Sequence, residues 1–131
     1  MRALFLMMFI PFGALALGDG AWQGSGVGVT LDHRGVAASS QPLAPPQPVS
    51  GRMSLIAWTY VLDGPTPAGL TVKLCSQTNC TSIDGQSGTT RGLTNTDANE
   101  PLRFVWEVPG GGSMYPPLRV RSNQVIVNYT R

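Results

Sequence analysis

Hydrophobic and polar residues alternate with a period of two along most of the chain, which is the pattern of half-buried β-strands. Shorter alternating stretches cover residues 27–32 and 70–75. The longest regular stretch places Leu102, Phe104, Trp106 and Val108 on one face and Arg103, Val105 and Glu107 on the other. Apolar residues do not recur at helical spacing beyond the N-terminal segment, so the pattern predicts an all-β protein.

The segment from Met53 to Leu62 is apolar on both faces. One face carries Leu55, Ala57 and Val61, and the other carries Ile56, Trp58, Tyr60 and Leu62. Such a strand lies in the middle of a sheet or turns one face towards a partner. The apolar neighbours of Trp58 and Trp106 predict that both indoles belong to the core.

The last segment contains a change of parity. Leu118 and Val120 are apolar at even positions, whereas Val125, Val127 and Tyr129 are apolar at odd ones. A regular strand cannot hold both sets on one face, because a slip of one residue reverses every side chain. A bulge or a turn is therefore predicted around residues 122–124, and we favour a bulge between two strand segments.

Turn residues separate these strands, as in Asp63-Gly64-Pro65 and Asp84-Gly85. The proline-rich stretch 41–48 is interpreted as an extended loop between sheets. Roughly seven short strands with turns every 8–12 residues predict a single-domain antiparallel β-sandwich, immunoglobulin-like in general architecture. A small β-barrel is the alternative.

The first residues have the layout of a secretory signal peptide. Arg2 is followed by an apolar run over residues 3–12 and by Ala14-Leu15-Ala16, a signal-peptidase pattern. We predict cleavage after residue 16, with a second possible cut after Gly18, and a single β domain over residues 17–131. The apolar run is shorter than the about 20 residues that span a bilayer, which disfavours the alternative of an uncleaved anchor. No later run is long enough for a membrane span.

Nine basic and seven acidic residues nearly cancel, which gives no electrostatic footprint for nucleic acid. Cys75 and Cys80 enclose four polar residues, and outside the cytoplasm we expect them to form a disulfide across the end of a hairpin. The alternative of a metal site lacks further ligands, because the single histidine, His33, is remote in sequence.

No nucleophile with a base and no carboxylate pair stands out, so the sequence predicts no enzyme activity and no cofactor. His33, between Asp32 and Arg34, is interpreted as a solvated or hydrogen-bonded loop residue. A hydrolase whose site is assembled only in space remains the alternative.

The candidates for partner binding are Trp22, Arg103, Arg119 and Arg121. Trp22 is the tryptophan that the pattern leaves free to stack on a ligand or a partner, and it motivates the alternative of a glycan- or peptidoglycan-binding module. The arginines form either a solvated sheet face or a basic patch. An exposed edge strand can also accept the strand of a partner or of a second copy, because few charges guard the edges.

Several stretches together resemble the FlhE family of flagellar accessory proteins, whose operon also encodes components of the export gate. They occur in the family's order and at similar spacing over nearly the whole mature chain. The stretches are Gly20–Gln23, Gly64–Leu70, Cys75–Gln77 with Cys80, Asp84–Thr90, Pro101–Gly112 and Val120–Tyr129.

The resemblance implies a periplasmic, non-enzymatic role in flagellar assembly, whose loss would disturb motility or swarming. The protein would either act at the type III export gate and limit proton leakage, or chaperone rod or hook subunits and prevent misplaced assembly. Its partners would be the export apparatus or the rod and hook proteins. The family supplies no binding residues that can be transferred to this chain.

Overall fold

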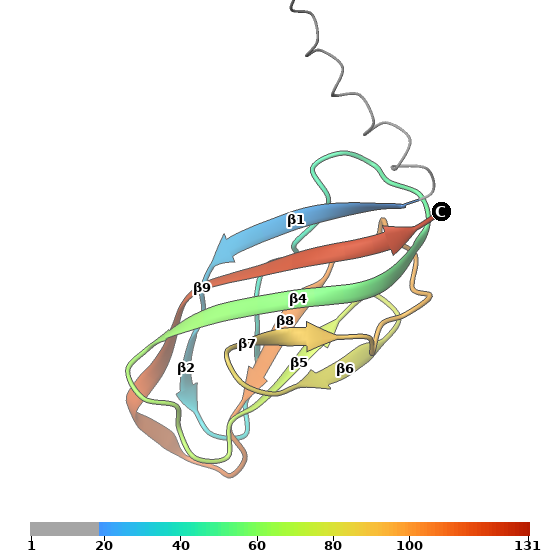
Figure 1. Ribbon diagram of the computed structural model, residues 1–131. Helices are drawn as coiled ribbons and strands as arrows, with labels where there is room; N and C mark the ends of the chain where they lie inside the picture. Colours follow the sequence, from blue (N-terminus) through green and yellow to red (C-terminus); the bar gives the residue numbers. More distant parts are fainter. Residues whose placement is uncertain (1–18) are drawn as a thin grey trace, which may run out of the picture.

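A computed structural model describes residues 19–131, which form nine β-strands and no helix (Figure 1). The strands are β1 (Asp19–Val27), β2 (Thr30–His33), β3 (Ala38–Ser39), β4 (Arg52–Asp63), β5 (Thr71–Cys75), β6 (Cys80–Ile83), β7 (Ser87–Thr90), β8 (Arg103–Glu107) and β9 (Ser113–Thr130). The predicted signal peptide lies outside the described residues. Within residues 19–131, no helix is long and apolar enough to cross a membrane.

The strands form two antiparallel sheets that pack face to face (Figure 1). Sheet A has the order β1-β9-β4-β7, and β2 also pairs with β9. Sheet B has the order β3-β8-β5-β6. Both sheets keep open edges instead of closing on themselves, so the predicted β-sandwich is confirmed and the alternative of a barrel is wrong.

The hydrophobic core fills the space between the sheets. Tyr60 of sheet A meets Phe104 and Trp106 of sheet B edge to face, with ring centroids 5.9 and 5.7 Å apart. Phe104 and Trp106 stack on each other at 5.4 Å, and neither exposes any surface. Such aromatic pairs add about 0.5–1.5 kcal/mol each to the stabilisation from burial alone. Trp58 is also buried, so the prediction that Trp58 and Trp106 belong to the core is confirmed.

Strands β4 and β9 are the long central strands of sheet A. As predicted, β4 lies between two neighbours, β9 and β7. The bulge predicted in the last segment is also confirmed, although it lies just before the predicted residues 122–124. Leu62 pairs with Val120 and Val61 pairs with Ser122, so Arg121 is the extra residue of β9. This one residue turns both Val120 and Val125 towards the core.

The N-terminal strands differ from the predicted pattern. Residues 19–27 form a strand that the alternation did not reveal, and the chain leaves regular strand geometry at Gly28 and Val29. Val27 is consequently 76% exposed, whereas Leu31 is buried, so the two do not share the predicted face. The pairing of β1 and of β2 with β9 keeps the same register on both sides of Gly28 and Val29. The β1–β2 segment therefore changes its inward-facing parity at the level where β9 has its bulge.

The proline-rich stretch connects β3 of sheet B with β4 of sheet A, as predicted for a loop between sheets. Leu43 is buried and exchanges two backbone hydrogen bonds with Leu102, at 2.7 and 2.9 Å. At the predicted turns, Gly64 and Gly85 have φ values of 97° and 82°, a conformation that glycine adopts without strain.

Candidate functional site

The reactive side chains of the described residues lie apart from one another. The Nδ1 atom of His33 is 3.0 Å from Oδ1 of Asp32, and both side chains are exposed on the surface. Within residues 19–131, no three histidine, cysteine or acidic residues lie close enough together to hold a metal ion. His33 therefore occupies the solvated, hydrogen-bonded position that the sequence suggested.

Cys75 and Cys80 form the predicted disulfide, with their sulfur atoms 2.05 Å apart. The two residues are cross-strand partners at the end of the β5–β6 hairpin. The enclosed turn is closed by the backbone N–H of Ser76, which donates to the carbonyl oxygen of Asn79 at 2.7 Å. The disulfide therefore pins a local turn and does not link the two sheets.

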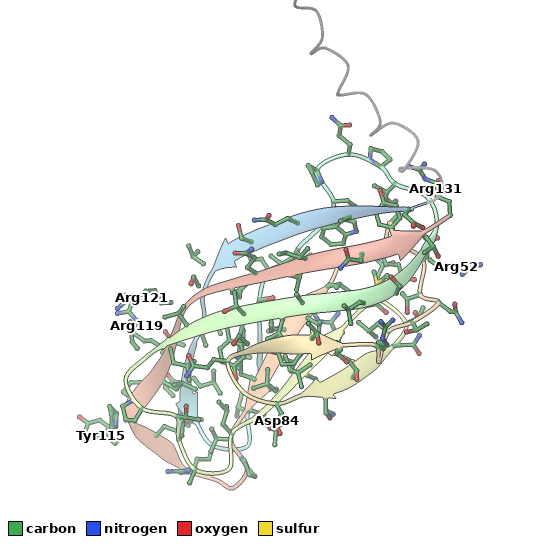
Figure 2. The ribbon with its side chains drawn as sticks, in the orientation of Figure 1. Arg52, Asp84, Tyr115, Arg119, Arg121 and Arg131 are labelled. Atoms are coloured by element: carbon green, nitrogen blue, oxygen red, sulfur yellow. A yellow bond between two sulfur atoms is a disulfide. The ribbon has the colours of Figure 1, made fainter. Side chains whose placement is uncertain are left out.

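Tyr60 is a titratable group whose environment shifts its pKa. Burial raises the pKa of Tyr60 above its usual value of 10.0, and the negative charge of Asp84 raises it further. Asp84 itself is exposed in the turn after β6 (Figure 2). A phenol whose pKa is raised stays neutral at physiological pH, so this shift creates no general base.

Trp22 does not occupy the exposed position that we predicted. Its side chain is 5% exposed, and its Nε1–H donates a hydrogen bond to the carbonyl oxygen of Ala98 at 2.9 Å. The inward positions beside Trp22 on β1 are Gly20 and Gly24, where Tyr129 and Leu43 occupy the space of a side chain, so β1 shows no hydrophobic alternation. The aromatic residue on which the glycan-binding alternative rested is thus part of the core.

The three candidate arginines do not form one patch. Arg103 lies on β8 of sheet B, whereas Arg119 and Arg121 lie on β9 of sheet A. Arg121 binds Asp63 through Nε at 2.9 Å and Nη2 at 2.5 Å, and Nε of Arg119 is 4.0 Å from the same carboxylate. Figure 2 shows the latter two arginines side by side at one end of sheet A. Exposed ion pairs of this kind contribute about 0–1 kcal/mol each.

The outer surface of sheet A carries no charged side chain over its central part. The cross-strand register aligns residues of β1, β9, β4 and β7 in three rows, which we call the neutral face. The rows are Gln23–Ile126–Ala57–Thr89, Ser25–Gln124–Thr59–Ser87 and Val27–Ser122–Val61.

The apolar side chains of the neutral face lie in its two outer rows, on either side of a polar middle row. Ile126 and Val61 are 38% and 42% exposed, although both belong to central strands. Ala57, Thr59, Gln124 and Ile126 surround a shallow hollow of about 180 Å³. The outer surface of sheet B differs, because its strands present Lys73, Arg103 and Glu107.

Depletion of charge is the compositional feature that separates the centre of a protein interface from ordinary surface. Four strands about 4.8 Å apart and three rows about 7 Å apart give the neutral face roughly 400 Å². A standard stable interface covers about 800 Å² on each partner. The neutral face alone therefore suits a transient partner better than a permanent one.

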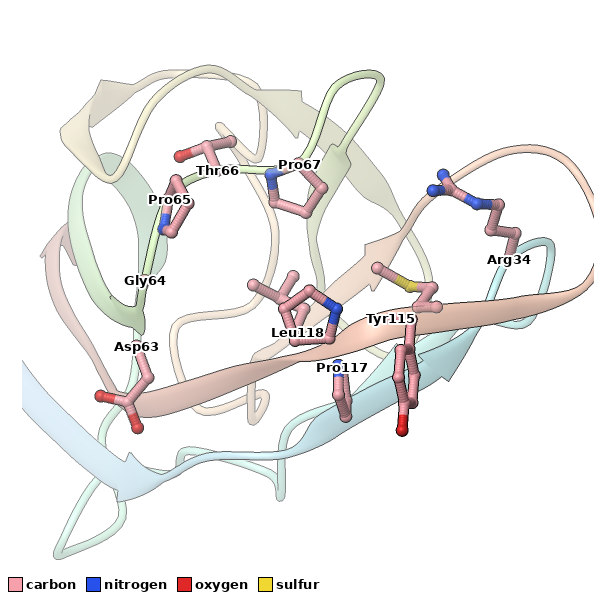
Figure 3. A pocket seen from close by; sticks show the side chains of 11 residues that line it. Arg34, Asp63, Gly64, Pro65, Thr66, Pro67, Tyr115, Pro117 and Leu118 are labelled. Atoms are coloured by element: carbon pink, nitrogen blue, oxygen red, sulfur yellow. The ribbon is translucent and has the colours of Figure 1, made fainter.

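A second hollow, which we call the proline cleft, lies beyond the end of the neutral face (Figure 3). It has a volume of about 270 Å³ and separates the connection after β4 from the first half of β9. The buried side chains of Met114 and Leu118 form its floor. The remaining lining residues are Arg34, Asp63, Gly64, Pro65, Thr66, Pro67, Tyr115, Pro116 and Pro117.

Strand β1 gives sheet A a long edge. In an antiparallel sheet, the backbone groups of successive residues point alternately towards one neighbouring strand and the other. Followed from β4 through β9 to β1, this alternation points the N–H and C=O groups of Ala21, Gln23 and Ser25 away from the sheet. Among the described residues, these groups have no hydrogen-bond partner. Leu43 and Ala44 lie against the inner side of this strand at Gly24, and their loop runs beside the edge (Figure 1). Pairing of this edge with a partner strand or a second copy stays a prediction.

A family model described as "Flagellar protein FlhE" matches residues 28–130. The chain belongs to the FlhE family. It is 63% identical to the flagellar protein FlhE of Salmonella typhimurium and 56% identical to that of Escherichia coli K12, in each case over 98% of this chain and 99% of the relative. The FlhE protein of Yersinia enterocolitica is 40% identical, over 96% of this chain and 91% of its own length.

A solved structure described as "Crystal Structure of FLHE" is similar to this chain throughout the sandwich. The TM-score is 0.85 at 68% sequence identity, and the match covers 87% of this chain and 99% of that one. The resemblance to the FlhE family is therefore confirmed, and a flagellar role follows from it. The names of these relatives describe flagellar proteins and no catalytic activity; the expectation that this chain is no enzyme stays a prediction.

For this FlhE-family chain, the sequence did not reveal either hollow or the neutral face as a unit. Gln23, Ala57 and Ile126 lie in one row but are far apart along the chain. The signal that was present is the two-sided hydrophobicity of residues 53–62, which suggested a face turned towards a partner. Tyr115, at 96% exposure, carried no signal because the two prolines that follow it interrupt any alternation.

Proposed function

We propose that this chain is a periplasmic, non-enzymatic accessory protein that binds flagellar components through the neutral face. The family supports a flagellar role, and the N-terminal signal sequence supports export. The observation that carries the proposal is the absence of charge from the central outer surface of sheet A, in a chain with sixteen Lys, Arg, Asp and Glu residues elsewhere. Residues at these positions exclude water from an interface without leaving a charge buried and unpaired.

Of the two roles that the family resemblance implies, we favour chaperoning of rod or hook subunits over regulation of the export gate. A chaperone must release its client when the client assembles, so weak and reversible contact suits it. The neutral face covers roughly half the area of a standard stable interface, which favours such contact. Binding to a gate component that limits proton leakage is the other outcome of the test below.

The test compares two isosteric substitutions that each add one negative charge. Gln124 lies at the centre of the neutral face, whereas Gln41 is exposed in the loop after β3. Purified wild-type protein, Gln124→Glu and Gln41→Glu are immobilised and exposed to separately purified rod, hook and export-gate proteins. We expect the wild type and Gln41→Glu to bind at least one rod or hook protein equally. Gln124→Glu should bind that protein about tenfold or more weakly, because the new carboxylate would lose its water in the interface without gaining a partner.

If the wild type binds only an export-gate protein, the result would support regulation of the export gate and contradict the chaperone role. Failure of the wild type to bind any of these proteins would contradict the proposed function. Equal binding by all three proteins would leave a flagellar role but remove the neutral face as its site.

A further inference from the structure

We propose that the proline cleft docks an extended segment of a flagellar subunit, one that presents an apolar side chain beside an aspartate or glutamate. This inference rests on the proposed function and names the chemistry of the partner. It starts from the shape of the cleft. The volume of about 270 Å³ is below the range of about 300–1,000 Å³ typical of small-molecule sites, and it suits one or two side chains.

The walls of the cleft are apolar and stiff. Pro65 and Pro67 line one side and Pro117 lines the other, and the ring of Tyr115 lies beside Pro117 and points away from Pro65 and Pro67 (Figure 3). Proline has a fixed φ and loses little conformational freedom when a ligand binds. The prolines of these walls also lack a backbone N–H donor, which disfavours addition of a regular strand and favours an occupant that is held by burial of its side chain.

Tyr115 has the character of a binding residue. It is 96% exposed, the largest value among the exposed large hydrophobic residues of the described part, 19–131. Tyrosine and arginine dominate the energetics of protein interfaces because they combine a large contact area with polar groups. An apolar side chain of the partner that enters the cleft would reach the floor at Met114 and Leu118, and the residues next to it in the partner would cover the exposed ring of Tyr115.

The charges around the cleft determine whether it favours a positively or a negatively charged segment. Asp63, at one end, is neutralised by Arg121 and lies near Arg119. Arg34, at the opposite end in Figure 3, forms no side-chain ion pair or hydrogen bond with any of residues 19–131. Two guanidinium groups therefore lie at the one carboxylate of the lining, and the unpaired guanidinium of Arg34 lines the other end of the cleft. A carboxylate of the partner fits Arg34, because a guanidinium binds a carboxylate through two parallel hydrogen bonds.

The test uses peptides that tile purified rod and hook subunits, measured by fluorescence anisotropy against the mature oxidised protein. For each peptide that binds, a second version has its acidic residue replaced by the corresponding amide, and a third has its apolar residue replaced by serine. The protein variants are Arg34→Gln, Tyr115→Ala and the control Lys73→Gln, which removes a cation from the outer surface of sheet B. Arg34 and Tyr115 are exposed, so both variants should fold as the wild type does.

We expect Arg34→Gln to weaken acidic peptides about tenfold and to leave their amide versions unchanged, as for one charge-assisted contact. Tyr115→Ala should weaken the apolar peptides but not their serine versions, and Lys73→Gln should change nothing. Equal loss of acidic and amide peptides in Arg34→Gln would overturn the proposal. Binding of intact subunits that neither variant alters would overturn it too, while leaving the proposed function in place. If neither subunits nor peptides bind the wild type, both ideas fail.

Discussion

Replacing Trp22 by alanine removes an indole that is 95% buried in the core at the N-terminal edge of sheet A. Truncation of a buried tryptophan destabilises a protein by about 3–5 kcal/mol, through lost burial and the cavity left behind. The carbonyl oxygen of Ala98, whose residue has no exposed surface, also loses the donor that now lies 2.9 Å away. The expected loss is a large share of the about 5–15 kcal/mol that stabilises an ordinary domain.

The assay is equilibrium unfolding in urea, followed by far-ultraviolet circular dichroism with the disulfide intact. Trp22→Phe keeps most of the apolar volume but leaves a small cavity and loses the hydrogen bond, so it should cost about 1–3 kcal/mol, less than Trp22→Ala. Val36→Ala, at a position 61% exposed, is the control and should change stability by no more than about 0.5 kcal/mol. A loss below about 1 kcal/mol for Trp22→Ala would refute the buried position and restore a surface role for this residue.

Three further substitutions test the sandwich itself. A Cβ atom at Gly28 would overlap a backbone carbonyl oxygen of β9, so Gly28→Ala should lower the free energy of unfolding by about 1–3 kcal/mol. The control is Gly111→Ala, which places its methyl group in open space and should leave the free energy of unfolding unchanged. The pKa of Tyr60 is raised in the folded protein, so with rising pH its phenol ionises first in the unfolded chain. The part of the free energy of unfolding that is present below pH 10.0 should therefore be lost as the pH rises through the folded pKa. Urea titrations on either side of that pH should show a smaller fall for Tyr60→Phe. Joint replacement of Cys75 and Cys80 by alanine should cost about 2 kcal/mol without unfolding the protein, and reductant should then have no further effect.

The parts of the fold that could be predicted are those in which one strand alone shows its inward face. Phe104 and Trp106 lie on the apolar side of an alternation that covers a whole strand, and the parity change between Val120 and Val125 requires a bulge or a turn whatever the partner strand is. Strand β1 gave no such signal. Its inward positions next to Trp22 are glycines, so no alternation marks the inward face of β1. The burial of the indole depends on residues of other elements.

The candidate site was less predictable, because it depends on register between distant strands. Gln23 and Ile126 become neighbours only when β1 pairs with β9, and no local pattern in either segment marks that row as uncharged. The proline cleft joins residues 63–67 with residues 114–118 across the end of the sandwich. Arg119 and Arg121 were singled out from their alternation alone, but their pairing with Asp63 comes from the same long-range register.

The most direct test of the neutral face as the site of flagellar binding is photocrosslinking in the periplasm of motile cells. A photoreactive residue is placed at Ile126, on the central strand β9 of the neutral face, or at Lys73, on the outer surface of sheet B. The account predicts adducts with rod or hook proteins from position 126 and none from position 73. Adducts that form only from position 73, or equally from both, would contradict it.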